Sequence, residues 1–213
     1  MKQGAIFDMD GLLFDTERLY QDSWVQTAAD FGQTPDPNFP KAICGTSGEH
    51  SLEVIRAHYP AVDAEAFLAH GVAWVQQQVA QGAPEKPGVH EILTYLRGCG
   101  VKLAVASSSG RAMIEGNLRH AGILELFDAV VSGDEVTRGK PEPDIFLLAA
   151  DKIGCAPQDC YVFEDGFNGV RAGAAAGCAT IMIPDLMQPD ETLRALCTGV
   201  YPSLLAALEG IRS

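Results

Sequence analysis

The sequence predicts an α/β protein, a doubly wound parallel sheet with an all-helical domain inserted near the start of the chain. Three patterns support this fold class. The apolar run from Ala5 to Phe7 is typical of a short buried strand. Residues 16–84 then show helical spacing of apolar side chains and no strand pattern. From residue 87 onward strand and helix patterns alternate, which indicates parallel strands joined by helices.

The inserted segment is expected to be purely helical. Apolar residues at helical spacing predict a first helix from Thr16 to Phe31, and Gly32 would end it. Residues 33–40 include three prolines and should form a connection. Further helices are predicted over residues 51–59 and 63–79.

In the rest of the chain the predicted elements alternate as a parallel sheet requires. Helices are expected at residues 89–98, 113–121, 143–153 and 170–176, and strands at residues 101–106, 129–131, 161–163 and 180–183. We expect residues 1–15 and 87–213 to form the core domain and residues 16–86 to form the inserted domain.

Composition and charge restrict the class of protein. The 213 residues are 47% hydrophobic and 20% charged, which is ordinary for a globular enzyme. A net charge of −13 argues against nucleic acid or an anionic membrane as a partner, because both require a basic surface. The six cysteines show no metal-binding spacing, so we expect reduced, mostly buried thiols. With no signal peptide or long apolar run, the expected location is cytoplasmic.

Asp8 and Asp10 directly follow the first predicted strand. The carboxyl ends of parallel strands form the edge of the sheet where ligands bind. Two carboxylates one residue apart repel, so one tends to keep its proton while the other stays ionised. The pair can therefore supply a nucleophile and a general acid. A polar turn is the alternative, and the apolar run after Gly11 makes it less favoured.

Three more polar groups lie at predicted strand ends. Ser107 and Ser108 precede a helix, whose N-terminal N–H groups can bind an anion, although such residues are also ordinary helix caps. Lys140 lies between a glycine and a proline, which would hold its charge in place. Glu164 and Asp165 end another strand and offer the hard oxygen ligands that Mg²⁺ prefers.

The run from Asp8 to Glu17 resembles the first motif of the haloacid-dehalogenase-like hydrolases, and in particular the phosphatases of their β-phosphoglucomutase-like branch. Ser107, Lys140 and the pair Glu164–Asp165 resemble the second, third and fourth motifs in the family's order. The resemblance extends through Pro184. It implies a Rossmann-like catalytic core and makes the inserted helices a cap domain.

The resemblance also implies a mechanism. Asp8 would attack phosphorus to form an aspartyl phosphate, while Asp10 would protonate the leaving oxygen and later activate water. Ser107, Ser108 and Lys140 would bind the phosphoryl group. The implied cofactor is Mg²⁺, with four ligands that share this edge of the sheet: Asp8, the backbone carbonyl of Asp10, Glu164 and Asp165.

The substrate would be a small phosphomonoester, read by the cap, with the enzyme acting as a monomer. The run from Asp15 to Tyr20 is similar to the pseudouridine-5′-phosphate phosphatases, which favours a nucleoside or sugar monophosphate. Glu17 would either face the substrate pocket or be an exposed acid in the first turn of a helix.

Three alternatives from other classes differ from this reading in the residues they require. A haloacid dehalogenase of this family would lack Asp10. A phosphohexomutase of the β-phosphoglucomutase type would have His at the position of Tyr20 and Arg at that of Gly48, so the sequence favours hydrolysis. A non-catalytic binding protein would have lost at least one motif residue, and none is lost.

Overall fold

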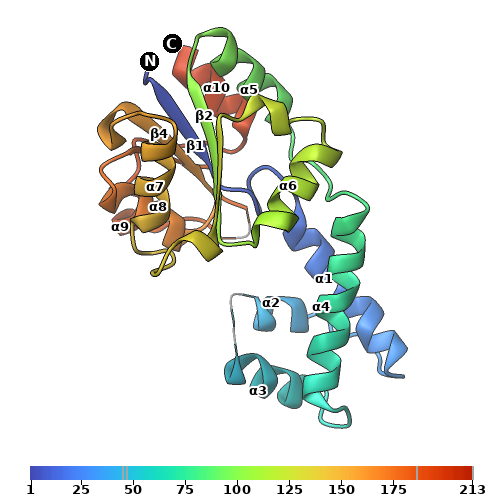
Figure 1. Cartoon of the computed structure of the whole chain (residues 1–213). Helices are drawn as coiled ribbons and strands as arrows, with labels where there is room; N and C mark the ends of the chain where they lie inside the picture. Colours follow the sequence, from blue (N-terminus) through green and yellow to red (C-terminus); the bar gives the residue numbers. More distant parts are fainter. Residues whose placement is uncertain (45, 47, 186, 213) are drawn as a thin grey trace. The chain divides into compact units, whose positions relative to one another are not determined.

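The computed structural model describes residues 1–44, 46, 48–185 and 187–212 (Figure 1). The chain divides into two compact units. The first comprises Met1–Asp15 and Pro84–Ser213, and the second comprises Thr16–Ala83. The first unit is an α/β domain and the second is helical over its described residues.

The first unit is built on a parallel sheet, which confirms the predicted fold class. Over the described residues its strand order is β3-β2-β1-β4-β5-β6. The strands are β1 (Gly4–Phe7), β2 (Lys102–Ser107), β3 (Ala129–Ser132), β4 (Cys160–Glu164), β5 (Ala179–Met182) and β6 (Gly199–Val200). The order reverses between β1 and β4, because the chain returns from β3 to the far side of β1. Ligands bind at such a reversal, outside the carboxyl ends of the strands.

Helices cover both faces of the sheet (Figure 1). They are α5 (Val89–Gly98), α6 (Arg111–His120), α7 (Asp144–Lys152), α8 (Phe167–Ala175), α9 (Glu191–Arg194) and α10 (Leu204–Arg212). Successive strand residues point to opposite faces. Ile6 therefore packs with residues of α7 and α8, whereas Phe7 stacks on Phe163 with ring centroids 4.5 Å apart. Apolar residues on both faces are what a sheet buried on both sides needs.

The second unit contains α1 (Thr16–Asp30), α2 (Phe39–Ile43), α3 (Glu49–His58) and α4 (Ala64–Ala80). Helix α2 corrects the prediction that residues 33–40 form only a connection. Pro40 lies in the first turn of α2, where its missing N–H would have no partner within the helix. No helix within the described ranges is both long and apolar enough to cross a membrane.

Aromatic rings form the core of the second unit. The indole of Trp24 lies almost parallel to the ring of Phe67, with centroids 6.4 Å apart, and edge-on to Phe39 at 5.7 Å. Gly71 of α4 approaches it so closely that an added Cβ would lie 2.3 Å from Trp24 Cζ3. These contacts hold the indole in one position.

Two hydrogen bonds join the chain where it leaves and re-enters the first unit. The N–H of Asp15 donates to the carbonyl of Pro84 (2.7 Å), and the N–H of Lys86 donates to the carbonyl of Leu13 (2.9 Å). The Lys86 ammonium also contacts Asp185 at 2.6 Å. Residues 84–86 therefore belong to the first unit, and the division falls at Ala83 rather than at residue 86.

The carboxylate of Glu135 contacts residues of three elements of the first unit: β3, α6 and α7. Glu135 completes a capping box with Ser132, whose N–H donates to Oε1 at 3.0 Å. Its carboxylate also pairs with Lys152 and accepts from Arg111 Nη2 at 2.6 Å. The hydrogen bond from Lys152, followed by those from Ser132 and Arg111, lowers the pKa of Glu135 to about 2, although burial opposes the change.

The expectation that the six cysteines are mostly buried is wrong. Only Cys160 is buried, at the start of β4, and Cys99 is exposed. Cys99 directly follows the last residue of α5, in a glycine-flanked turn at the surface, so its thiol is not buried in the apolar core.

Candidate active site

The first motif forms a tight turn after β1. The N–H of Asp8 donates to the carbonyl of Phe163 at 3.0 Å, which fixes the start of the turn against β4. Gly11 has φ 83°. A Cβ at this glycine would lie 2.3 Å from Asp165 Oδ2, so both the backbone conformation and the close approach require glycine.

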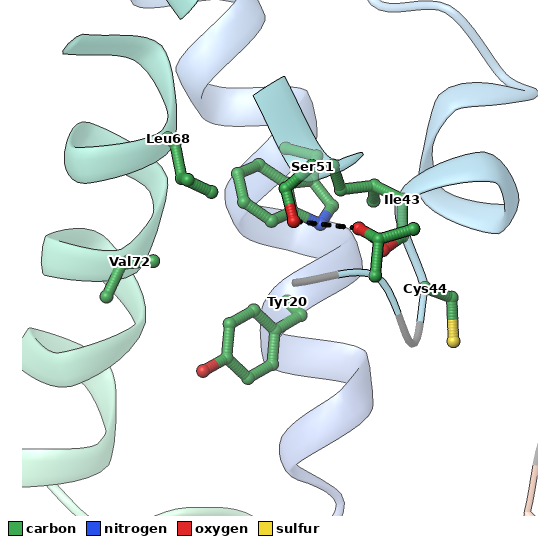
Figure 2. Close-up of a pocket in the computed structure, with 8 residues that line it drawn as sticks. Tyr20, Ile43, Cys44, Ser51, Leu68 and Val72 are labelled. Atoms are coloured by element: carbon green, nitrogen blue, oxygen red, sulfur yellow. Dashed lines mark hydrogen bonds between the residues drawn. The ribbon is translucent and has the colours of Figure 1, made fainter. Parts of the chain in front are cut away.

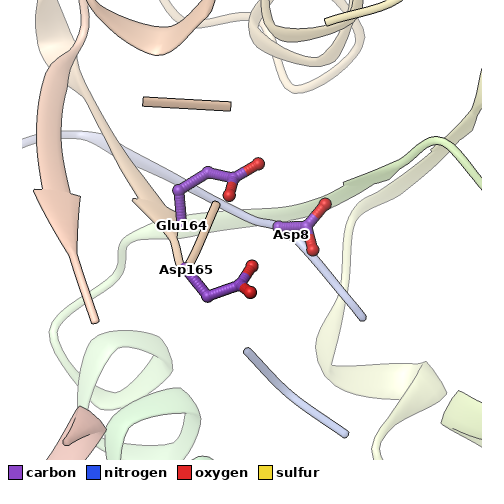
Figure 3. A group of neighbouring side chains, drawn as sticks. All are labelled: Asp8, Glu164 and Asp165. Carbon is purple, nitrogen blue, oxygen red and sulfur yellow. The ribbon is translucent and has the colours of Figure 1, made fainter. Parts of the chain in front are cut away.

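Three carboxylates meet at the point where the strand order reverses. Asp8 follows β1, Glu164 ends β4 and Asp165 follows it (Figure 3). Each offers one oxygen, and these oxygens lie within 4.8 Å of one another. Figure 3 shows the three side chains as neighbours at this edge. Hard oxygen ligands at this spacing can hold a divalent cation.

The ammonium of Lys140 lies against this acidic cluster. It donates to Asp8 Oδ1, to Glu164 Oε1 at 2.7 Å and to the carbonyl of Ala106 at 3.2 Å. The three charged side chains are each less than 10% exposed. Burial alone would lower the pKa of Lys140, but the charges of Asp8 and Glu164 more than offset it and raise the pKa above its usual value.

One ammonium does not neutralise three carboxylates, of which Asp8 and Glu164 are buried and Asp165 is partly buried. Burial raises the pKa of Asp8 to about 8; the charges of Glu164 and Asp10 act in the same direction, and Lys140 opposes them. Burial, with the charges of Glu164 and Asp8, raises the pKa of Asp165 to about 9. A divalent cation would balance this excess of negative charge, so the residues present fit such an ion.

Asp10 is held by two serines at the end of β2. Ser109 Oγ donates to Asp10 Oδ2 at 2.8 Å and Ser107 Oγ donates to the same oxygen at 3.2 Å. The N–H of Ser109 donates to Ser107 Oγ at 3.0 Å. The carboxylate of Asp10 is therefore oriented by hydroxyl groups and is not part of the acidic cluster.

Some of the site residues predicted from the sequence lie together in the structure, and others do not. Asp8, Lys140, Glu164 and Asp165 are in direct contact or in one cluster, and Ser107 reaches Asp10. Ser108 is exposed, and its hydroxyl has no hydrogen bond among the described residues. Ser109 was not predicted to have a role. It lies in the bend that follows β2, and its place in the serine run after the strand was the available signal. The side chain of Glu17 lies outside the described part of the chain.

Comparisons with known proteins identify the family of the chain. The family described as haloacid dehalogenase-like hydrolase matches residues 5–183, and the chain belongs to this family. The predicted resemblance is therefore confirmed.

Named relatives and a solved structure share most of the chain. It is 36% identical over 187 residues to a probable pseudouridine-5′-phosphatase of Drosophila melanogaster, covering 85% of this chain and 81% of the relative. It is 32% identical over 180 residues to a phosphorylated carbohydrates phosphatase of Thermotoga maritima, covering 84% and 83%. A crystal structure of a putative β-phosphoglucomutase from Thermotoga maritima superposes with a TM-score of 0.85 at 27% identity, covering 99% and 98%.

Proposed function

We propose that the protein is a Mg²⁺-dependent phosphatase that hydrolyses a small phosphomonoester through a covalent intermediate on Asp8. The observation that carries the proposal is the Lys140 ammonium, which contacts Asp8 and Glu164 at the carboxyl edge of the sheet. A fixed buried cation beside a carboxylate suits the transfer of a dianionic phosphoryl group to that carboxylate. The phosphatase names of the two relatives support the same class of reaction.

In the first step a carboxylate oxygen of Asp8 attacks phosphorus, and the bond from phosphorus to the ester oxygen breaks. Asp10 donates its proton to that leaving oxygen, and Ser107 and Ser109 keep the carboxyl group in position. In the second step Asp10 takes a proton from water, and the hydroxide attacks phosphorus. Inorganic phosphate leaves, and Asp8 is free again.

Mg²⁺ would be held by Asp8, Glu164 and Asp165, with the backbone carbonyl of Asp10 as a further ligand. When bound, the ion would supply positive charge to the phosphoryl oxygens. Lys140 would add a second positive charge on the side of Asp8 and Glu164.

Hydrolysis is favoured over phosphate return to a hexose. Tyr20 and Gly48 occupy the two positions where mutases of the resembling branch carry His and Arg. The likeness to a putative β-phosphoglucomutase keeps the mutase as the second candidate. We also propose that residues 16–83 are the cap domain of this enzyme.

The experiment is a comparison of Asp8→Asn with Asp151→Asn. Asp151 is an exposed acid of α7, so its replacement makes the same chemical change away from the site. Phosphate release from a panel of nucleoside and sugar monophosphates should fall at least about a thousandfold in Asp8→Asn and in protein treated with EDTA. Asp151→Asn should keep the wild-type rate. Turnover of Asp8→Asn at the wild-type rate would refute the covalent mechanism.

A further inference from the structure

An aromatic ring of the first unit contacts the ammonium of Lys140. Phe146 is fully buried in α7, and the Nζ of Lys140 lies over its ring, 4.9 Å from the centroid. A cation at this distance over the face of an aromatic ring is attracted by the quadrupole of the ring. The one other such pair among the described residues, Arg212 over Tyr95, joins α10 to α5.

The surroundings of this pair exclude water. The side chain of Lys140 is 8% exposed, and Phe146 belongs to an apolar cluster that includes Ile6 and Ala106. Attraction between a cation and a ring is largest where no solvent competes for the charge. The ring therefore acts on the ammonium under the conditions in which its effect is strongest.

The other groups that hold the ammonium are hydrogen-bond acceptors. The three N–H bonds of Lys140 are directed to Asp8, Glu164 and the carbonyl of Ala106. The ring of Phe146 is thus not a further acceptor, and it acts on the charge itself. Asp8 and Glu164 are also the proposed metal ligands, so their negative charge would be shared with a second cation. The ring is neutral, and its attraction for Lys140 would not be shared in this way.

The backbone fixes the ring close to the start of α7. The N–H of Phe146 donates to the carbonyl of Pro143 at 3.0 Å, and the N–H of Glu142 donates to the carbonyl of Gly139 at 3.0 Å. A lysine side chain is long and flexible, whereas a buried phenylalanine has two side-chain torsions and is confined by packing. The ring is therefore a rigid support for a flexible charged group.

We propose that Phe146 is a positioning residue of the active site, whose ring keeps the ammonium of Lys140 at the acidic cluster by cation–π attraction. The inference rests on the proposed phosphatase function, because Lys140 is the fixed positive charge of that reaction. Phe146 itself is buried below the site and acts through Lys140.

The test replaces Phe146 by monofluoro-, difluoro- and trifluorophenylalanine. Fluorine withdraws electron density from the ring face with little change in ring size, so the attraction for the ammonium weakens stepwise while the packing is kept. The kcat/KM for phosphate release from a panel of nucleoside and sugar monophosphates should fall with each fluorine, to about a tenth of the wild-type value for the trifluorinated ring. A ring that serves only to pack would give no graded loss.

Phe127 provides the matched control. Its ring packs edge-on to Phe7, with centroids 6.2 Å apart, and no cation lies over it in the described part of the chain. Trifluorophenylalanine at position 127 should leave kcat/KM unchanged.

Thermal unfolding gives a readout that does not depend on activity. The metal-free protein is compared with the natural and the trifluorinated ring at position 146, each with Lys140 and with Lys140→Met. The trifluorinated ring should lower the melting temperature by about 4–8 °C more when Lys140 is present, because only then is there a charge for the ring to attract. An equal shift in both backgrounds would overturn the inference.

The outcomes separate the two proposals. Phosphate release at the same rate with all four rings would overturn the role of Phe146 and leave the phosphatase intact. No release from any substrate would overturn the phosphatase. In that case the melting temperatures still decide whether the ring keeps the ammonium in place: a shift that requires Lys140 supports this contact, and a shift independent of Lys140 overturns it.

Discussion

Replacing Gly169 by alanine should disrupt the acidic cluster from outside it. Gly169 is buried in α8, and a Cβ there would lie 1.7 Å from Glu164 Oε1, about half an ordinary contact distance. The Glu164 carboxylate cannot simply turn away, because Oε1 accepts from Lys140 and Oε2 accepts from the N–H of Gly166 at 2.9 Å. Glu164 is also only 2% exposed, so no solvent-filled space is open to it.

Two opposing contributions decide whether Gly169→Ala raises or lowers the free energy of unfolding. Alanine is a better helix former than glycine by about 1 kcal/mol. Against this, overpacking costs about 1–3 kcal/mol, and loss of a hydrogen bond to a charged group adds about 1.5–3 kcal/mol. The net loss should be about 1.5–5 kcal/mol, which for a chain of this size lowers the melting temperature by roughly 3–20 °C.

Gly116→Ala provides the matched control. Gly116 is an exposed glycine of α6, and a Cβ there would meet nothing within 4 Å. The variant should gain up to about 1 kcal/mol of stability from helix propensity alone. Thermal unfolding with and without Mg²⁺, together with phosphate release, measures the contrast. If Gly169→Ala were as stable as Gly116→Ala and fully active, the Glu164 carboxylate would not be fixed in place and the reasoning would fail.

Two further predictions concern buried and partly buried charges. Lys140→Met leaves the carboxylates of Asp8 and Glu164 without the ammonium that pairs with them. The metal-free variant should therefore lose about 3 kcal/mol of unfolding free energy at pH 7. An unchanged melting temperature would contradict this prediction. Glu135 has a pKa of about 2 in the folded protein against 4.5 as its ordinary value, so its stabilisation is complete above about pH 4.5 and is lost as the pH falls through about 2. In urea unfolding, the free energy of unfolding of Glu135→Gln should be about 1–2 kcal/mol below that of the wild type at pH 7, a range that allows for solvent screening at this partly exposed site. The difference should shrink as the pH falls towards 2. A difference that did not change with pH would show that Glu135 does not act through its charge.

Much of the fold follows from local patterns. The strands β1, β2, β3, β4 and β5 were predicted to within about one residue at each end, because each is a short apolar run bounded by polar residues or glycine. Strand β6 was not predicted: Gly199–Val200 is too short to show a pattern and exists through pairing with β5. Helix α2 was missed because Pro40 in its first turn, with Pro35 and Pro37 just before it, also suits a loop.

The site was predictable only in part. Strand ends place Asp8, Glu164 and Asp165 at one edge of the sheet, and local sequence shows this. That Lys140 contacts both Asp8 and Glu164 depends on the fold, because the residues are far apart in the sequence. A pocket of about 280 Å³ in the second unit (Figure 2) is likewise not visible in the sequence, since its walls come from four separate helices and a loop.

The paired chain segments at the division between the two units have a consequence for protein engineering. Asp15 and Pro84 are hydrogen bonded, and Phe14 forms an antiparallel bridge with Glu85, so the core presents the two open ends of a hairpin. A two-residue Asn-Gly turn is the natural closure for such ends. We therefore expect that residues 16–83 can be deleted and replaced by a short turn, or exchanged for another inserted domain, without a change in the register of the sheet.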